Sequence, residues 1–323
     1  MARRLSHLTF AAAVSAIALL GATQGAQAGA AAFSTTQISN FIISNGSGPL
    51  TNGVNVTLSN PLNAESTSAT LNATNTVNSN LAVAPNDNQS CLGNCAGFTP
   101  GNAFTLVTPT LQVSKTPFVQ SAANLGPDEL VNVPPLPAGA MANSAAQVQL
   151  IGANTGQSNS NVGVTAGFVL TLVGAGGSEN ITGTFNAFTQ LLAQTDSTGA
   201  SSFAQSSYQI LVTDQNNNLL FSWNPNGLNT NASGSDLVSV NDMGVNLNNQ
   251  RSANFDNLVL PYMASGTGLT FTANLPENVP LNFLITQRNF ASAISIPEPM
   301  SLALFGAGLL GFGVVSRKRR RRA

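Results

Sequence analysis

The chain has 323 residues, of which 43% are hydrophobic and only 7% are charged, and its formal net charge at pH 7 is −1. Most basic residues lie at the two ends, so residues 29–295 contain only three basic residues and eleven acidic ones. Because binding to a phosphate backbone needs clustered Lys and Arg side chains, this composition excludes a nucleic-acid partner.

The first 28 residues predict an export signal. Arg3 and Arg4 form a positive start, residues 10–20 form an apolar run, and a small-x-small pattern closes the segment. We expect cleavage between Ala28 and Gly29. An uncleaved N-terminal anchor is the alternative, but an apolar run this short favours a signal peptide.

The exported chain would contain no histidine, because His7 is the only one in the sequence. A Ser-His-Asp triad, a Cys-His pair and an HExxH zinc site are therefore excluded. Glycoside hydrolysis by two carboxylates about 5 to 10 Å apart stays open. The candidate carboxylates are Glu65, Asp87, Asp128, Glu129, Glu179, Asp196, Asp214, Asp236, Asp242, Asp256 and Glu277. Most of these carboxylates lie among Asn, Gly and Ser, which is typical of acidic residues that form turns. We therefore expect no enzymatic activity, no cofactor and no metal.

Residues 29–295 predict an antiparallel all-β fold of the sandwich or jelly-roll type. Short β-rich runs recur between turns of Asn, Gly, Ser and Pro. They span residues 55–59, 104–113, 146–151, 167–173, 208–213, 219–223, 255–260, 269–275 and 281–286. Apolar residues alternate with polar ones at Val54, Val56 and Leu58, which is typical of half-buried strands. Helices are expected only at the two ends.

One segment is a candidate internal break. Three prolines between Val131 and Ala140 would interrupt strand pairing. The only Trp and both Tyr follow this segment, so the C-terminal half has the better core. We expect one elaborated sandwich, with two β units as the alternative.

Cys91 and Cys95 predict a local disulfide, because an exported chain reaches an oxidising compartment. Their spacing differs from that of a CxxC redox motif, and no basic residue lies nearby to stabilise a thiolate. Two free thiols are the alternative.

Asp214, Asn216 and Asn218 alternate as in the first half of a calcium-binding loop. Leu219 and Pro225 stand where such a loop would place its turn glycine and its bidentate glutamate, so an EF-hand is excluded. The β-rich runs on either side predict a hairpin, with the polar string as its turn.

Trp223 and Tyr262 are the candidate stacking platforms for a sugar. A surface rich in Asn, Thr, Ser and Gly would suit contact with a hydrated polysaccharide. The alternative for Trp223 is packing in the core, because Trp is buried on average.

At the C-terminus, an uncharged run from Met300 to Val315 precedes a basic cluster. As a helix this run would span roughly 24 Å, against a hydrocarbon core of roughly 30 Å, so it would hold the chain only temporarily. The basic cluster would stop transfer and stay in the cytoplasm. It consists of Arg317, Lys318, Arg319, Arg320, Arg321 and Arg322.

Pro297, Glu298 and Pro299 come directly before this run. The order of the three elements resembles the PEP-CTERM sorting signal of Gram-negative bacteria, over residues 296–323. The resemblance implies that an exosortase, an integral-membrane cysteine transpeptidase-like enzyme, recognises the Pro-Glu-Pro motif and releases or transfers the protein. Two prolines would also keep this peptide extended. A plain C-terminal anchor is the alternative.

The sequence therefore predicts a non-enzymatic structural or adhesive protein of the cell surface or of an extracellular polysaccharide matrix, as in a biofilm or floc. The expected partners are an exosortase-type enzyme, the inner membrane transiently, and extracellular polysaccharide. A carbohydrate-binding sandwich that uses Trp223 and Tyr262 is the first alternative, and a carboxylate-dependent glycoside hydrolase is the second.

Overall fold

The computed structural model describes residues 29–72, 74–81, 86–93, 95, 117–125, 140–150, 156–195, 200–254 and 258–295. The predicted strand at 104–113, most of the candidate break at 131–140, and both expected helical ends lie outside these residues. All secondary-structure elements within the described residues are β-strands. Within those ranges, no helix has the length and apolar character needed to cross a membrane.

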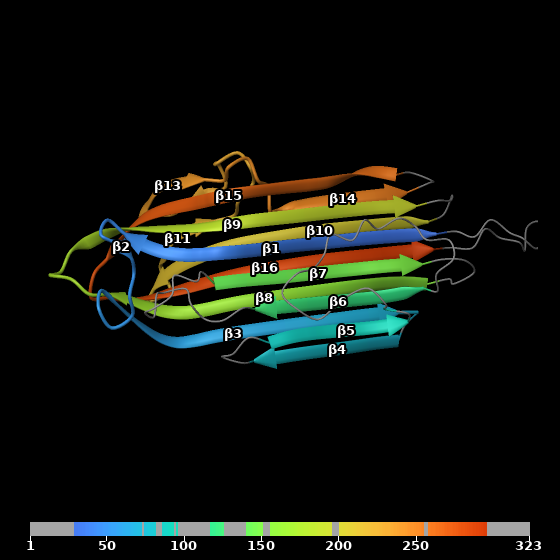
Figure 1. Ribbon diagram of the computed structural model, residues 1–323, viewed down its shortest axis with the longest axis horizontal. Helices are drawn as coiled ribbons and strands as arrows, with labels where there is room; N and C mark the ends of the chain where they lie inside the picture. The colour runs from blue at the N-terminus through green and yellow to red at the C-terminus, as the bar shows by residue number, and fades with distance from the viewer. Residues whose placement is uncertain are drawn as a thin grey trace, which may run out of the picture.

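The described strands form two eight-stranded antiparallel sheets (Figure 1). In spatial order the first sheet contains β13 (Leu237–Asn241), β15 (Leu258–Pro276), β9 (Ser178–Thr195), β1 (Ala30–Asn45), β7 (Ala140–Leu150), β6 (Phe118–Leu125) and β5 (Asn86–Gly93), with β2 (Gly48–Pro49) paired to β1. The second contains β12 (Ala232–Ser233), β11 (Leu219–Trp223), β10 (Ser201–Asp214), β16 (Pro280–Ser295), β8 (Gly156–Leu172), β3 (Val56–Leu71) and β4 (Thr74–Leu81), with β14 (Asn249–Asn254) paired to β10.

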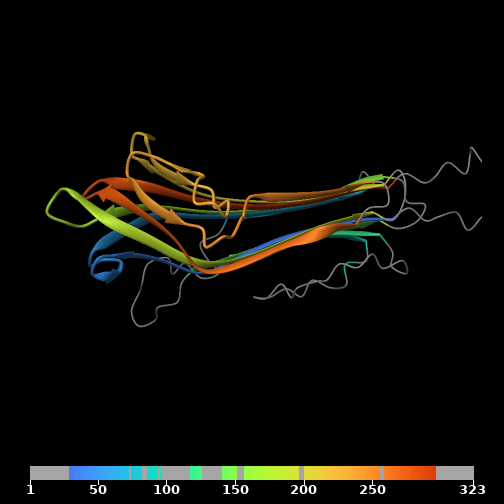
Figure 2. The ribbon, with the colours of Figure 1, turned by 90° about the horizontal axis from the view of Figure 1, so that it is seen from above.

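The two sheets pack face to face as a sandwich, which confirms the antiparallel all-β prediction for the described residues (Figure 2). The chain passes repeatedly from one sheet to the other, so neighbours in the sequence are often in opposite layers. Strands from the two sides of residues 131–140 pair directly, β6 with β7 and β3 with β8.

The strands are much longer than the β-rich runs visible in the sequence. β9 has 18 residues, β15 has 19 and β16 has 16. In β16 buried and partly exposed residues alternate along nearly the whole strand, as expected for one core face and one outer face. β1 and β9 were not among the predicted strands, because small and polar residues conceal their alternation.

The core changes character along the strands. One end holds the aromatic residues, where the ring centroids of Phe185 and Trp223 lie 5.6 Å apart and those of Phe221 and Phe271 lie 4.9 Å apart. The other end is filled mainly by Ala and Val, including Ala32, Ala146, Val148, Val164, Ala204 and Ala293. Figure 2 shows that the two layers converge toward this second end, as small side chains permit.

Buried polar side chains cross the interior near the Ala-rich part of the core. Ser34 Oγ donates to Asn289 Oδ1 at 2.6 Å, and Gln287 Nε2 donates to the Thr36 carbonyl at 2.8 Å. Asn289 and Gln287 also bond to Ser144. Because each unpaired buried polar group would be costly, this network favours one relative position of β1, β7 and β16.

Both ends of the described body leave the sandwich at the same end. Ala30 pairs with Leu150 and with Thr195 in the first sheet, and Ser295 pairs with Gly156 in the second. We call this the terminal end (Figure 1). The opposite, loop end carries the turns at residues 46–55, 173–177, 214–219 and 277–279.

Candidate functional site

The predicted sorting motif follows a central strand of the second sheet. β16 ends at Ser295 and lies between β10 and β8, with which it pairs along almost its full length. Pro297 is only two positions further along the chain. The motif itself, the uncharged run and the basic cluster lie outside the described residues, as does the predicted signal peptide up to Ala28.

Trp223 is completely buried in the aromatic part of the core. Its Nε1 donates to Asp242 Oδ1 at 2.9 Å, and its ring contacts Phe271 at a centroid distance of 6.0 Å. No ring face is available to a sugar, which corrects the candidate role of Trp223 as a stacking platform. The alternative of core packing describes this residue.

Tyr262 on β15 is half-buried, and its surroundings occupy both the hydroxyl and the ring. The hydroxyl accepts from the backbone N–H of Asn246 and donates to the carbonyl of the same residue, at 3.1 and 3.0 Å. The guanidinium carbon of Arg251 lies 5.0 Å from the ring centroid, within the range of a cation–π contact. Tyr262 therefore ties the segment between β13 and β14 to the first sheet.

Asp242 organises residues 224–248, the long segment that follows β11. It is fully buried. Besides the indole of Trp223, its carboxylate accepts from the backbone N–H groups of Asn226 and Asn229, both at 3.0 Å. No strand was predicted from the sequence in this segment. The bond from Asp242 to Trp223, 19 positions away, could not be inferred from the local pattern.

Asp214 closes the β10–β11 hairpin, as the sequence predicted. Its Oδ1 accepts from the backbone N–H groups of Asn216 and Asn218, both at 2.8 Å, and its Oδ2 accepts from the Asn218 amide at 2.7 Å. The side-chain hydrogen bond from Asn218 is the main reason that the pKa of Asp214 is lowered. The carboxylate thus acts as a turn former.

Other described acidic residues also have structural contacts. Glu277 accepts from the backbone N–H of Gly176, Glu179 accepts from the Asn45 amide, and Asp236 accepts from Ser235. Glu65 is buried on β3. Asp128, Glu129, Asp196 and Asp256 lie outside the described residues, and the side chain of Asp87 is not described. The described residues contain no cluster of three or more His, Cys, Asp or Glu side chains that could hold a metal ion.

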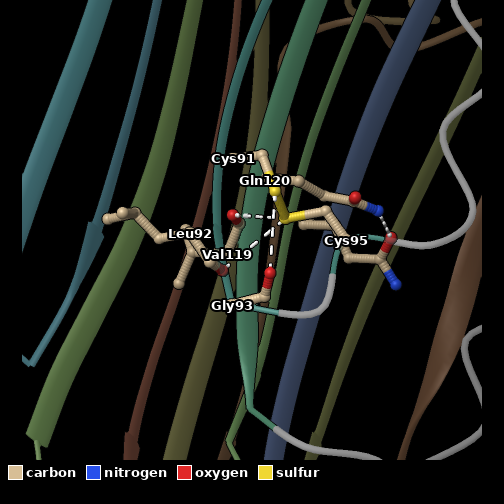
Figure 3. Close-up of a disulfide and its surroundings, with 7 residues drawn as sticks. Cys91, Leu92, Gly93, Cys95, Val119 and Gln120 are labelled. Carbon is tan, nitrogen blue, oxygen red and sulfur yellow. Dashed lines mark hydrogen bonds between the residues drawn. A yellow bond between two sulfur atoms is a disulfide. The ribbon is translucent and has the colours of Figure 1, made fainter.

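Cys91 and Cys95 form the predicted disulfide, with Cα atoms 6.1 Å apart (Figure 3). The bond closes a small loop where β5 ends, and the sulfur of Cys95 lies 3.5 Å from the carbonyl oxygen of Val119 at the start of β6. Next to it, the Gln120 amide donates to Gln147 at 2.9 Å. The disulfide therefore secures the edge of the first sheet.

The outer face of the first sheet carries an open hollow where two β-bulges meet. The pairing of β1 with β9 shifts between Ser39 and Ile42, and that of β15 with β9 shifts between Gly266 and Leu269. Both shifts face the same short stretch of β9. We call this feature the bulge hollow; it is lined by Gln37, Ser39, Asn186, Ala187, Phe188, Met243, Ser265, Gly266 and Thr267.

The bulge hollow was not predicted from the sequence, because bulges in strands far apart in the chain leave no local signal. None of its lining residues is charged. Its chemistry is limited to neutral hydrogen bonding and apolar contact.

The comparison with known families decides the nature of the C-terminus. Residues 295–321 match the model of the PEP-CTERM protein-sorting motif. The chain carries a PEP-CTERM sorting motif. The match begins at the last residue of β16 and contains the Pro-Glu-Pro sequence, the uncharged run and nearly all of the basic cluster. Such a motif indicates an exported protein that an exosortase processes.

A search of curated proteins found no match. A chain from the crystal structure of the T13 IBDV viral particle aligns with 85% of this chain and 79% of its own length, at 11% identity. Its TM-score of 0.08 is too low to support any conclusion about fold or function.

Proposed function

We propose that this chain is an exosortase substrate that serves as a non-enzymatic structural or adhesive protein of the cell surface or the extracellular polysaccharide matrix. The observation that carries the proposal is the PEP-CTERM motif at residues 295–321, attached directly to the last strand of a long β-sandwich. The β-sandwich is the part of the chain that is exported, and the motif directs its sorting.

The position of the terminal end supports the proposal that the chain is held at the membrane by its C-terminus before an exosortase processes it. Pro297 follows Ser295 by two residues, which span at most about 7 Å when extended. While the uncharged run is held in the inner membrane, the terminal end must therefore lie close to the membrane surface. The loop end then points away from the membrane, so the sandwich would stand on the membrane before its release.

The contacts of the described carboxylates support a non-enzymatic role. Asp214, Asp242 and Glu277 each accept hydrogen bonds from backbone N–H groups of turns. A catalytic pair would need two carboxyl groups that face a shared space for substrate. The bulge hollow, which could accept a ligand, is lined by no acidic residue.

Two sorting variants test the proposal in a host that carries an exosortase. Glu298→Ala should leave full-length protein in the inner membrane, because the processing enzyme no longer recognises the motif. Replacement of Arg317, Lys318 and the four following arginines by Ser should instead release unprocessed protein, because insertion scales assign each mid-membrane cation about 2.5 to 3.5 kcal/mol.

Fractionation followed by intact-mass measurement distinguishes the two failures. A conservative control, Ser301→Thr, changes the uncharged run without changing its charge or length and should be processed as the wild type is. If Glu298→Ala and the Ser variant are both exported and trimmed like the wild type, the C-terminus is a simple hydrophobic tail and the proposal is wrong.

A further inference from the structure

We propose that the bulge hollow is a binding site for a neutral carbohydrate. The proposal rests on the matrix function proposed above and adds the class of ligand and its location. The hollow lies on the outer face of the first sheet, where no residue had been assigned a role.

The centre of the site is Phe188 on β9. Its neighbours Ala187 and Thr189 are buried, and Thr189 bonds across the interior to Ser206 of the second sheet, so Phe188 lies on the outer face. Gln37 on β1 and Ser265 on β15 are its direct partners in the two flanking strands. A half-buried aromatic ring thus has an amide on one side and a hydroxyl on the other.

A second row of polar groups runs beside the ring. Asn186 pairs with Ser39 on β1, and Thr267 of the β15 bulge lies opposite. The Oδ1 atom of Asn186 accepts from the backbone N–H of Gly268 at 3.1 Å. This bond fixes the orientation of the amide, whose NH₂ group supplies two donors.

The two bulges coincide with the hollow on the outer face of the sheet. A bulge adds a residue to one strand, bends it and changes the direction of its side chains. Here the bulges of β1 and β15 lie on both sides of β9 at the same level, and residues next to both bulges line the hollow together with Asn186 and Phe188. Met243, of which 51% is exposed, adds an apolar wall from the long segment after β11.

This combination matches the surface of a neutral sugar. A pyranose ring has an apolar face of C–H groups that can lie on an aromatic ring, and a rim of hydroxyl groups that donate and accept. Amide and hydroxyl side chains satisfy such hydroxyl groups in both directions. The absence of Lys and Arg from the lining disfavours a uronate or phosphate ligand, which would need a cation.

The test measures binding of the exported protein to immobilised neutral polysaccharides, namely glucans, mannans and galactans, with a polyuronate as the charged comparison. The protein is purified in whichever processed form its host yields, so failed sorting does not affect the assay. We expect saturable binding to at least one neutral polymer. Phe188→Ala should weaken that binding by about tenfold or more, the loss expected when an aromatic contact is removed.

Asn186→Asp is the second variant, because a carboxylate retains the acceptor for Gly268 but loses the amide donors. It should also weaken binding, by about threefold to tenfold. The matched control is Phe290→Ala, which removes a half-buried outer-face Phe from the other sheet. Each variant is checked for an unchanged melting temperature, and Phe188→Leu replaces Phe188→Ala if the alanine variant unfolds.

Three outcomes would overturn the proposal. One is the absence of binding to any neutral polymer. Another is binding to the polyuronate alone. The third is neutral-polymer binding that Phe188→Ala and Phe290→Ala reduce equally. None of these results would affect the sorting function, which depends on the C-terminal motif.

Discussion

At the scale of single residues, buried polar groups determine the shape of the segment after β11. Trp223, Asn226 and Asn229 all donate to the same carboxylate. Val245 and Leu247 anchor part of the segment in the core, while residues 224–231, next to these donors, are mostly turn-forming. Asp242 therefore has a structural role that its polar sequence surroundings do not reveal.

We predict that Asp242→Ala lowers the free energy of unfolding by about 2 to 4 kcal/mol, because it leaves the buried indole N–H of Trp223 and two partly buried backbone N–H groups without an acceptor. Chemical denaturation monitored by Trp fluorescence measures this loss directly, since Trp223 is the only Trp in the chain. Asp236→Ala, which removes an acid bonded to the neighbouring Ser235, is the control and should cost less than about 1 kcal/mol. Equal effects of the two changes would refute the structural role of Asp242.

Asp214 predicts a pH dependence of the β10–β11 turn. Hydrogen bonds from Asn218 and Asn216 stabilise the ionised carboxylate and lower its pKa in the folded state. Its contribution to stability is therefore present above the unfolded pKa, and it is lost as the pH falls through the lower folded pKa, below about pH 4. A carbon-detected NMR titration should place the Asp214 midpoint below the ordinary value, and Asn218→Ala should raise that midpoint. An unchanged midpoint in the variant would contradict this cause.

At the scale of elements, local signals predicted some strands well and others poorly. β11 coincides with the predicted run at 219–223, and the first part of β16 with the run at 281–286, because these β-rich runs lie beside clear turn residues. β1 begins with three alanines and continues through Ser and Thr, so its burial depends on packing against β7 and β9 and not on a local pattern. The sequence also does not show which side of a strand faces the core. For this reason Trp223 was considered as an exposed stacking platform as well as a core residue.

Local signals likewise predicted some of the candidate sites and missed others. The disulfide and the hairpin turn each join residues within five positions, so spacing was sufficient to predict them. The bulge hollow joins residues of β1, β9 and β15 with part of the long segment after β11, and only the register of three strands brings them together.

The disulfide should contribute modestly to overall stability. Because only four positions separate Cys91 from Cys95, the chain-entropy model assigns the bond at most about 2 kcal/mol. Thiol labelling of the denatured, unreduced protein should detect no free Cys, and reduction should lower the melting temperature by only a few degrees. Labelling of both cysteines without reduction, or unfolding on reduction alone, would contradict this prediction.

At the scale of the whole molecule, the last strand completes the second sheet. β16 is the partner of both β8 and β10, so its loss would leave each of these long strands without a partner on one side and would split the second sheet in the middle. The chain must therefore be exported as far as Ser295 before the fold can close. The match to the sorting motif begins at Ser295, the last residue of β16.

We predict that a chain of residues 29–295 unfolds in one cooperative thermal transition, whereas residues 29–279 give no such transition. The loss of β16 removes Leu281, Phe283 and Ile285 from the core together with the pairing on both sides. Circular dichroism and calorimetry check both chains. A cooperative transition in the shorter chain would show that β16 is peripheral.

We propose that an exosortase releases this chain after export. The most direct test of this proposal is the intact mass of the protein recovered from isogenic hosts with and without the exosortase. With the enzyme present, we predict a chain that begins at Gly29 and has lost the uncharged run and the basic cluster; without it, we predict a chain that retains both and stays in the inner membrane. A C-terminus that is identical in the two hosts would show that the exosortase does not process this chain.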